Sequence, residues 1–323
     1  MKIIVTMCIM FWAINGFSQL GLTKNYQDII LKNKLKNVTT MYYESEDTTK
    51  SLGRVLFKEE FDIDGKVKLD YVFTFWDVVS YDHTTTYKYD TIGNLIEKTI
   101  IQKILNLNKR DDECIKALGD EPINEAWIYK YDSSNRLVKE DKYSYSKEKY
   151  DLLKDLRFTI NYYYNSKGLL KKETGTTPKE ILSSENYITT FKYDNKGNKT
   201  HELKILTRDN NKSKIIKQYI YNLKGKLIEE ETKYSDFSQY NEHYKYEYNN
   251  FDKKSKVLSY SEKDKDWKVY DTYEYNDKGN LIIKGDEETK YDFYDNGLIK
   301  RELWKDNESN AVVNFITTYE FYK

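Results

Sequence analysis

The residues best suited to catalysis or metal binding are few and widely separated in this chain. Its three histidines, His83, His201 and His243, have no metal-ligand partner at zinc-finger or helical spacing. We therefore interpret them as strand or surface residues. The segment from Asp62 to Gly65 resembles part of a calcium-binding loop, but its glycine falls at the fourth position and the closing glutamate is absent, which favours a turn.

Motifs for covalent or phosphate chemistry are missing from the sequence. There is no G-x-S-x-G element, no phosphate-binding glycine loop and no Cys-His signature. Carboxylates are plentiful, but nothing in the sequence selects one pair of them for glycoside hydrolysis. The sequence therefore predicts a protein that is not an enzyme and that binds neither metal nor cofactor.

A repeated unit of two aromatics, a turn and a leucine organises the chain instead. In the copy at residues 273–281, Tyr273 and Tyr275 share one face of a strand, because strand side chains alternate. An Asn or Asp next starts a type I turn, and Gly279 accepts a positive φ. This combination predicts a β-hairpin with a glycine bulge, in which Tyr275 lies across from Leu281.

Copies of this unit recur with a usual spacing of about 28 residues, which is typical of a repeat protein. The predicted turn glycines are Gly65, Gly93, Gly168, Gly197, Gly225, Gly279 and Gly297. Asn135 and Asp252 replace the glycine in two copies, and both types tolerate left-handed geometry. The predicted repeat aromatics are Tyr87, Tyr89, Tyr129, Tyr131, Tyr162, Tyr164, Tyr193, Tyr219, Tyr221, Tyr246, Tyr248, Tyr273, Tyr275, Phe293 and Phe321.

These units, separated by polar turns such as residues 235–238, predict an all-β fold. The expected architecture is an antiparallel β-hairpin repeat array, an extended and curled meander of roughly 20 strands. With 32 Tyr and only 2 Pro in 323 residues, the composition suits strands whose rings are buried while their hydroxyls stay hydrated.

Residues 1–18 have the pattern of a bacterial secretory signal peptide. A short positive start precedes an apolar run and a small-x-small cleavage site before Gln19. The run is too short for a membrane span of about 20 residues, and no second hydrophobic segment follows. Cys8 would leave with the signal, so the mature chain would keep Cys114 and form no internal disulfide. We expect a secreted or periplasmic protein.

The mature chain divides into an N-terminal part, residues 19–56, and a repeat domain, residues 57–323. The first part is expected to hold a short helix within residues 25–35 and the first strands. Two polar insertions, residues 105–125 and 146–156, interrupt the repeats, and inserted loops of this kind often carry function.

The segments Tyr87–Leu95 and Tyr273–Leu281 resemble the tyrosine-aspartate (YD) repeats of the Rhs family of bacterial proteins, which also occur in teneurins. The resemblance covers residues 57–323 and identifies the chain as a short relative. It implies β-hairpins coiled into a continuous sheet, which in large family members forms a hollow shell around a toxin. Here the usual period exceeds the family's common one, and neither an Rhs core motif nor a toxin-like segment is recognisable.

Composition and pattern leave two interpretations of function open. The charges of the 53 basic and 53 acidic residues cancel, so no net field favours nucleic acid or an anionic membrane. Tyrosine ladders on an exposed face would bind an envelope glycan or a peptide, whereas the same ladders inside a curled sheet would form a scaffold. We predict a binding module or scaffold of the cell envelope. The alternative is a truncated toxin-shell or toxin-associated protein.

The last predicted strand, residues 311–322, bears on possible partners. Phe315, Thr317, Tyr319 and Phe321 share one face, and we expect nothing to cover the outer edge of this strand. A free edge presents unpaired backbone groups, so it predicts a protein partner bound by strand addition. The competing interpretation is that the strand folds back against the N-terminal segment.

Overall fold

The structure is a computed structural model of the chain. It describes residues 31–32, 34–43, 54–75, 79–106, 124–145, 156–178, 185–208, 211–277, 279, 281–285, 289–296, 298–305 and 312–322. The predicted signal peptide, Cys114, Gly297 and most of the two insertions lie outside these residues. Within residues 25–35, where a helix was expected, the structure describes four residues: Leu31 and Lys32 are helical, Lys34 lies in a turn and Leu35 begins a strand.

The described part of the chain is built from strands. They are β1 (Leu35–Tyr43), β2 (Arg54–Phe61), β3 (Val67–Phe75), β4 (Val79–Tyr89), β5 (Leu95–Asn106), β6 (Asn124–Tyr131), β7 (Leu137–Tyr145), β8 (Leu156–Tyr164), β9 (Leu170–Thr176), β10 (Glu185–Tyr193), β11 (Lys199–Arg208), β12 (Asn211–Tyr221), β13 (Leu227–Tyr234), β14 (Glu242–Tyr248), β15 (Lys254–Ser261), β16 (Asp266–Tyr275), β17 (Leu281–Lys284), β18 (Thr289–Phe293), β19 (Ile299–Lys305) and β20 (Val312–Phe321), with one 3-10 turn, η1 (Ser238–Tyr240). In this part of the chain, no helix has the length and apolar character needed to cross a membrane.

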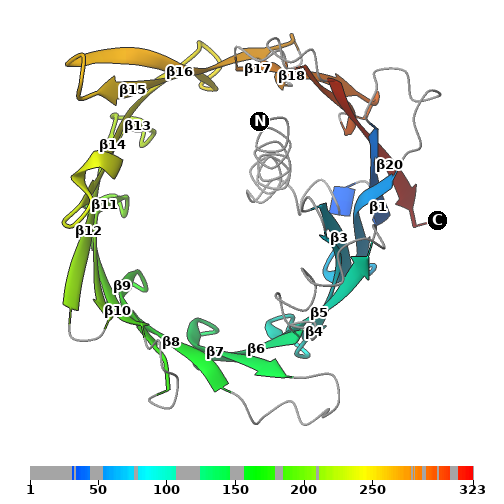
Figure 1. The fold of residues 1–323 in the computed structure, drawn as a ribbon, viewed down its shortest axis with the longest axis horizontal. Helices are drawn as coiled ribbons and strands as arrows, with labels where there is room; N and C mark the ends of the chain where they lie inside the picture. Colours follow the sequence, from blue (N-terminus) through cyan, green and yellow to red (C-terminus); the bar gives the residue numbers. More distant parts are fainter. Residues whose placement is uncertain are drawn as a thin grey trace.

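All the strands belong to one 20-stranded antiparallel sheet in which each strand pairs with its neighbours in sequence. The sheet bends into a closed ring, because β20 also pairs with β1 (Figure 1). The predicted all-β fold, an antiparallel hairpin array of about 20 strands, is therefore confirmed. Each of the twenty strands has a hydrogen-bonded neighbour on both sides.

The expected free edge of the last strand is wrong. β20 pairs with β19 on one side, and on the other side it pairs with β1 in a register that runs from Leu35 opposite Phe321 to Tyr43 opposite Asn314. The competing interpretation, in which this strand folds back against the N-terminal segment, is the one that the structure supports. The twist and coiling of successive strands add up around the array until the last strand meets the first.

The repeat unit forms the predicted hairpin. Tyr275 lies opposite Leu281, and the register shifts by one residue just before this pair, as a bulge requires. The same shifted pair closes the eight other hairpins of this type. Gly225 and Gly279 have φ values of 79° and 76°, where a side chain is disfavoured. Asn135 and Asp252 adopt the same geometry, with φ values of 62° and 59°.

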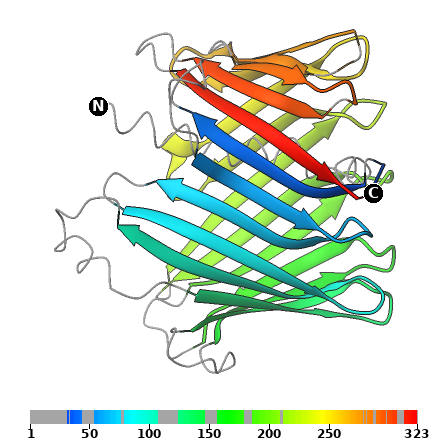
Figure 2. The ribbon, with the colours of Figure 1, turned by 90° about the vertical axis from the view of Figure 1, so that its right-hand side faces the viewer.

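All nine of these turns lie at one end of the ring, since each follows an even-numbered strand of a meander (Figure 2). We call this end the turn end and the opposite one the loop end. Seven of these turns are also closed by their own Asp or Asn side chain. Asp62, for example, accepts hydrogen bonds from the backbone N–H groups of Asp64 and Lys66 at 3.0 and 2.9 Å. This geometry supports the turn interpretation of the segment that resembles a calcium loop.

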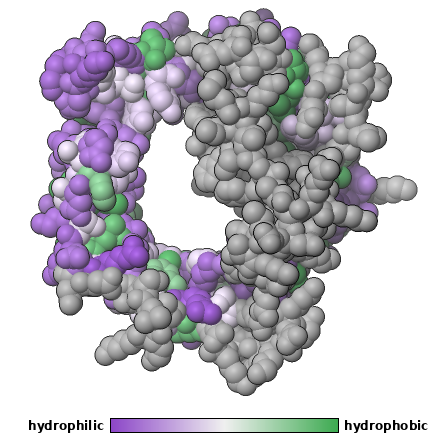
Figure 3. Space-filling model, viewed as in Figure 1, coloured by the Kyte–Doolittle hydropathy of each residue, from purple (hydrophilic) through white to green (hydrophobic). Residues whose placement is uncertain are grey.

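The repeat tyrosines face the inside of the ring. Along β12, alternate residues from Ser213 to Tyr221 are half-buried and those between them are exposed. A strongly curved sheet crowds the side chains on its concave face and spreads those on its convex face. We therefore assign the half-buried set to the inside, and call that face the inner wall. An opening remains in the middle of the ring, and the coloured residues around it are mostly hydrophilic (Figure 3).

Fully buried hydrophobic side chains concentrate where β20 meets β1. One cluster contains Tyr42, Leu56, Val313 and Phe315, and the other contains Leu35, Val38, Phe61 and Leu298. Between the clusters, the buried hydroxyls of Thr40 and Thr317 share a hydrogen bond of 3.0 Å. We call this contact the seam. It has the character of a small conventional core, whereas the rest of the ring is a single layer.

Candidate functional site

The second aromatic of each repeat ties its hairpin to the preceding one. In eight places, a tyrosine hydroxyl donates to the backbone carbonyl of the first residue in the second strand of the preceding hairpin, at 2.7 to 2.9 Å. The pairs are Tyr89 to Val67, Tyr131 to Leu95, Tyr164 to Leu137, Tyr193 to Leu170, Tyr221 to Lys199, Tyr248 to Leu227, Tyr275 to Lys254 and Tyr319 to Ile299. These bonds give seven of the predicted repeat aromatics a structural role, and Tyr319 shares it.

The last strand departs from the predicted alignment. Tyr319 makes the tyrosine-to-carbonyl bond there, whereas Phe321 is 46% exposed. Phe293, which has no hydroxyl, lies opposite Ile299 at the bulge of its own hairpin. Tyr322 adds a further closing bond, because its hydroxyl donates to the carbonyl of Phe61 at 2.6 Å.

The first aromatics of the repeats donate to carboxylates on the inner wall. Tyr162 bonds Glu140 at 2.8 Å, and Tyr246 bonds Glu230 at 3.1 Å. Burial, followed by the charge of Glu230, raises the pKa of Tyr246 above its usual range. Tyr87 with Asp70, Tyr219 with Glu202 and Tyr273 with Asp271 repeat the arrangement. Burial and the Glu140 charge also raise the pKa of Tyr129. These phenols remain neutral donors.

Lysines complete the inner wall. Lys199 forms an ion pair with Glu202 at 2.7 Å and lies 4.7 Å from the centre of the Tyr219 ring. Lys254 lies 4.4 Å from the centre of the Tyr246 ring, and burial lowers its pKa. The five carboxylates Asp70, Glu140, Glu202, Glu230 and Asp271 therefore already have phenol or ammonium partners.

One inner-wall carboxylate has an unusual environment. Glu302 of β19 lies opposite Phe315 and 3.5 Å from the hydroxyl of Tyr291. Burial raises the pKa of Glu302 to about 7, and the nearby Lys284 opposes that shift. The carboxyl is therefore partly protonated near neutral pH.

The three histidines lie on different strands and do not form a site. His83 is half-buried in β4, where burial lowers its pKa against the opposing charges of Asp82 and Asp70. His201 lies on β11, and His243 on β14 bonds the carboxylate of Glu229 at 2.6 Å. Within the described residues, no three His, Cys, Asp or Glu side chains come together as a group that could hold a metal ion.

An aromatic concavity lies in the connection between β13 and β14, at the loop end. It is lined by Tyr234, Phe237, Gln239, Tyr240, Asn241 and Glu242 and has a volume of about 500 Å³, which is in the size range of small-molecule sites. We call it the rim pocket. The side chain of Asn241 accepts a hydrogen bond from the backbone N–H of Tyr234 at 2.9 Å and so fixes the loop against the strand.

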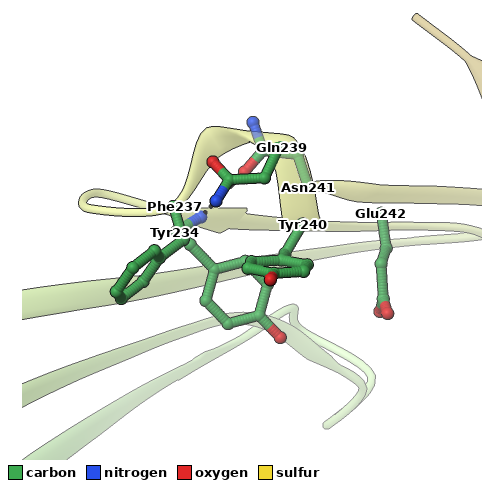
Figure 4. Close-up of a pocket in the computed structure, with 6 residues that line it drawn as sticks. All are labelled: Tyr234, Phe237, Gln239, Tyr240, Asn241 and Glu242. Atoms are coloured by element: carbon green, nitrogen blue, oxygen red, sulfur yellow. Dashed lines mark hydrogen bonds between the residues drawn. The ribbon is translucent and has the colours of Figure 1, made fainter.

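The aromatic rings of the rim pocket are unusually accessible. Phe237 is 55% and Tyr240 is 63% exposed, and their ring centres are 6.1 Å apart. Figure 4 shows the rings of Tyr234, Phe237 and Tyr240 gathered on one side of the connection, with Glu242 beside them. Among the described residues, the side chains of Gln239 and Glu242 have no hydrogen-bond partner, so both can bond a ligand.

The rim pocket was not among the sites predicted from the sequence. Residues 235–238 were expected to form a turn, and the chain does turn there, through η1. Two large aromatics in a polar turn are a signal that could have drawn attention to it, because turns seldom expose rings without a reason. The two insertions, where function was expected, lie mostly outside the described residues.

The comparisons with known proteins that follow show distant likenesses. No family model and no curated protein matches the chain. Among solved structures, TcdB2-TccC3-TEV is 13% identical with a TM-score of 0.35, and the match covers 85% of this chain and 14% of that one. Porin-like proteins from Bacteroides uniformis ATCC 8492 and Bacteroides vulgatus ATCC 8482 are each 10% identical. Their TM-scores are 0.37 and 0.26; the matches cover 89% and 88% of this chain, and 97% and 98% of theirs.

Proposed function

We propose that this chain is a non-enzymatic binding protein of the bacterial cell envelope that holds a short glycan in the rim pocket. The observation that carries the proposal is the exposed pair Phe237 and Tyr240 beside unpartnered polar side chains. The closed ring acts as the scaffold that holds the pocket in place.

The chemistry of the rim pocket suits a sugar. A pyranose ring has apolar C–H faces that pack on aromatic rings, and its edge carries hydroxyls that both donate and accept hydrogen bonds. Phe237 and Tyr240 supply the apolar platform, and the carboxylate of Glu242 accepts from hydroxyls. The amide of Gln239 can donate or accept.

Binding without hydrolysis follows from the acids available. Glycoside hydrolysis ordinarily needs two carboxyl groups on either side of the scissile bond. Of the described residues that line the rim pocket, Glu242 is the one with a carboxylate. The inner-wall carboxylates are held by tyrosines and lysines, which leaves them poorly suited to serve as the second group.

The test is a glycan array of bacterial envelope sugars, followed by saturation-transfer NMR with each sugar that is retained. The wild-type protein should bind at least one sugar of the array, and mass spectrometry should show that the length of the sugar chain is unchanged after binding. The double variant Phe237→Ala/Tyr240→Ala should lose that sugar. Tyr163→Ala, which removes a 47% exposed tyrosine from β8, is the matched control and should keep it. Retention by the double variant, or hydrolysis of the sugar, would refute the proposal.

Placement in the envelope rests on the signal-peptide pattern of residues 1–18. Protein exported by a Gram-negative host should begin at Gln19 when its intact mass is measured. A mass that retains residues 1–18 would remove this part of the proposal.

The alternative, a truncated toxin-shell component, finds less support. A shell of hairpins grows when further strands pair with the edge of its sheet, and here β1 and β20 occupy each other's edges. Closure of the ring therefore favours a self-contained binding protein.

A further inference from the structure

We propose that the turn end of the ring docks on the surface of a lipid bilayer and inserts apolar turn residues into it. The residues that carry this proposal are the tips of four hairpin turns, Ile63, Ile92, Leu223 and Phe251. Their exposed fractions are 76%, 74%, 94% and 80%, the largest among the exposed large hydrophobic side chains of the described chain. The proposal does not depend on the glycan pocket, which lies at the opposite end.

The tips are held outward by ordered turns. The side chain of Asn222 accepts from the N–H groups of Lys224 and Lys226, each at 3.0 Å, so the loop that presents Leu223 is closed from within. Asn249 closes the loop that presents Phe251 in the same way. Because these turns are already ordered, they lose little conformational entropy when their tips insert into a bilayer.

Neighbouring turns are also linked to one another. The ammonium of Lys196 donates to the carbonyl of Leu223 at 3.0 Å, and Lys224 forms an ion pair with Asp252 at 3.2 Å. The ammonium of Lys253 donates to the carbonyl of Gly279 in the next turn. The turns therefore form a connected rim and not a set of independent fingers.

The positions of the four tips on opposite sides of the ring favour a binding partner with a flat, extended surface. Ile63 and Ile92 follow β2 and β4, whereas Leu223 and Phe251 follow β12 and β14, across the ring from them (Figure 1). All four lie at the turn end, where Figure 2 shows the turns side by side. A peptide or a small domain could cover one pair at a time. A bilayer surface can accept both pairs at once.

The charges beside the tips differ between the two sides. Near Leu223 and Phe251, basic residues outnumber acidic ones; the basic residues are Lys196, Lys224, Lys226 and Lys253. The acidic residue Asp252 already forms ion pairs with Lys224 and Lys226. Near Ile63 and Ile92 the acidic residues prevail. Anionic lipid headgroups would therefore attract the side of the ring that carries Leu223 and Phe251. Insertion of apolar side chains would bind both sides to the bilayer.

The experiment uses the full mature chain and vesicles of phosphatidylethanolamine and phosphatidylglycerol. The wild type should co-sediment with them. A variant with all four tips changed to threonine should show a partition coefficient lower by about tenfold or more, because four apolar side chains no longer insert. Ile188→Thr is the matched control on the outer face of β10, where Ile188 is 44% exposed, and it should bind as the wild type does.

A second measurement tests the flat geometry. In a Cys114→Ser background, an environment-sensitive dye is placed at Leu223→Cys and, separately, at Ile92→Cys. Both labels should shift to the blue when vesicles are added. A shift at one position alone would show that only one side of the turn end meets the vesicle and would overturn the proposal, as would undiminished sedimentation of the four-tip variant or no sedimentation of the wild type. Loss of glycan binding in the Phe237→Ala/Tyr240→Ala variant should leave vesicle binding intact, which keeps the two proposals separable.

Discussion

Gly175, the last residue but one of β9, makes room for two aromatic rings. A Cβ atom at this position would lie 2.1 Å from Cε1 of Tyr187 and 2.5 Å from Cζ of Phe158. Those two rings pack against each other with centres 5.9 Å apart. The backbone of Gly175 is not in the positive-φ region, so its lack of a side chain is needed for packing and not for a turn.

The substitution Gly175→Ala sets two effects of opposite sign against each other. In an extended strand, replacing glycine by alanine stabilises by about 0.5–1 kcal/mol, because the unfolded chain loses conformational freedom. Overpacking of the Tyr187 and Phe158 rings costs roughly 1–3 kcal/mol. Since the contact distances lie far below van der Waals separation, we expect the overpacking to prevail and the variant to be destabilised by about 1–2 kcal/mol.

Urea unfolding followed by far-UV circular dichroism measures the effect. The control is the same substitution in a Phe158→Ala/Tyr187→Ala background, where both rings that the added Cβ would meet are gone. There Gly175→Ala should become neutral or stabilising. If the substitution destabilises equally in both backgrounds, the ring-packing explanation is refuted.

Three further outcomes are expected. Tyr221→Phe, which removes a tyrosine-to-carbonyl bond, should lower the free energy of unfolding by about 1 kcal/mol, and Tyr163→Phe should leave it unchanged in the same urea titration. Gly225→Val, at a φ of 79°, should cost on the order of 1 kcal/mol or more, while the melting temperature of Lys224→Ala should equal that of the wild type. Because burial raises the pKa of Glu302 to about 7, the folded state binds more protons than the unfolded one between about pH 4.5 and 7, and stability should fall as pH rises through that window. Glu302→Gln should lose this pH dependence, and an unchanged pH profile would show that another group is responsible.

The sequence predicted the hairpin unit well because the interactions that form it are local. The pairing of Tyr275 with Leu281 follows from an Asn that starts the turn and a glycine that accepts positive φ, all within nine residues. Closure of the ring was not predictable in the same way. It depends on the accumulated coiling of twenty strands, and nothing in Leu35–Tyr43 marks it as the partner of the last strand.

The rim pocket and Gly175 escaped sequence reasoning for a related reason. Phe237 and Tyr240 belong to a turn, where hydrophobic residues have no period that distinguishes a binding surface from chance. The role of Gly175 depends on rings from β8 and β10, which the sheet brings to either side of β9. Side-chain packing between strands that are separated in sequence leaves no local signature.

The contacts of the seam join residues much farther apart in the sequence than the contacts of the hairpins do. Each hairpin joins residues that are close in sequence, but Thr40 and Thr317 are separated by 277 positions. By loop-closure entropy, joining ends so far apart costs about 2 kcal/mol more than closing a segment of about 20 residues. The hairpins should therefore assemble first and the seam last, as one late annealing step. Until the seam forms, β1 and β20 have unpaired edges whose registers match. At high protein concentration during refolding, β1 of one molecule can pair with β20 of another, and the product would be a domain-swapped double ring.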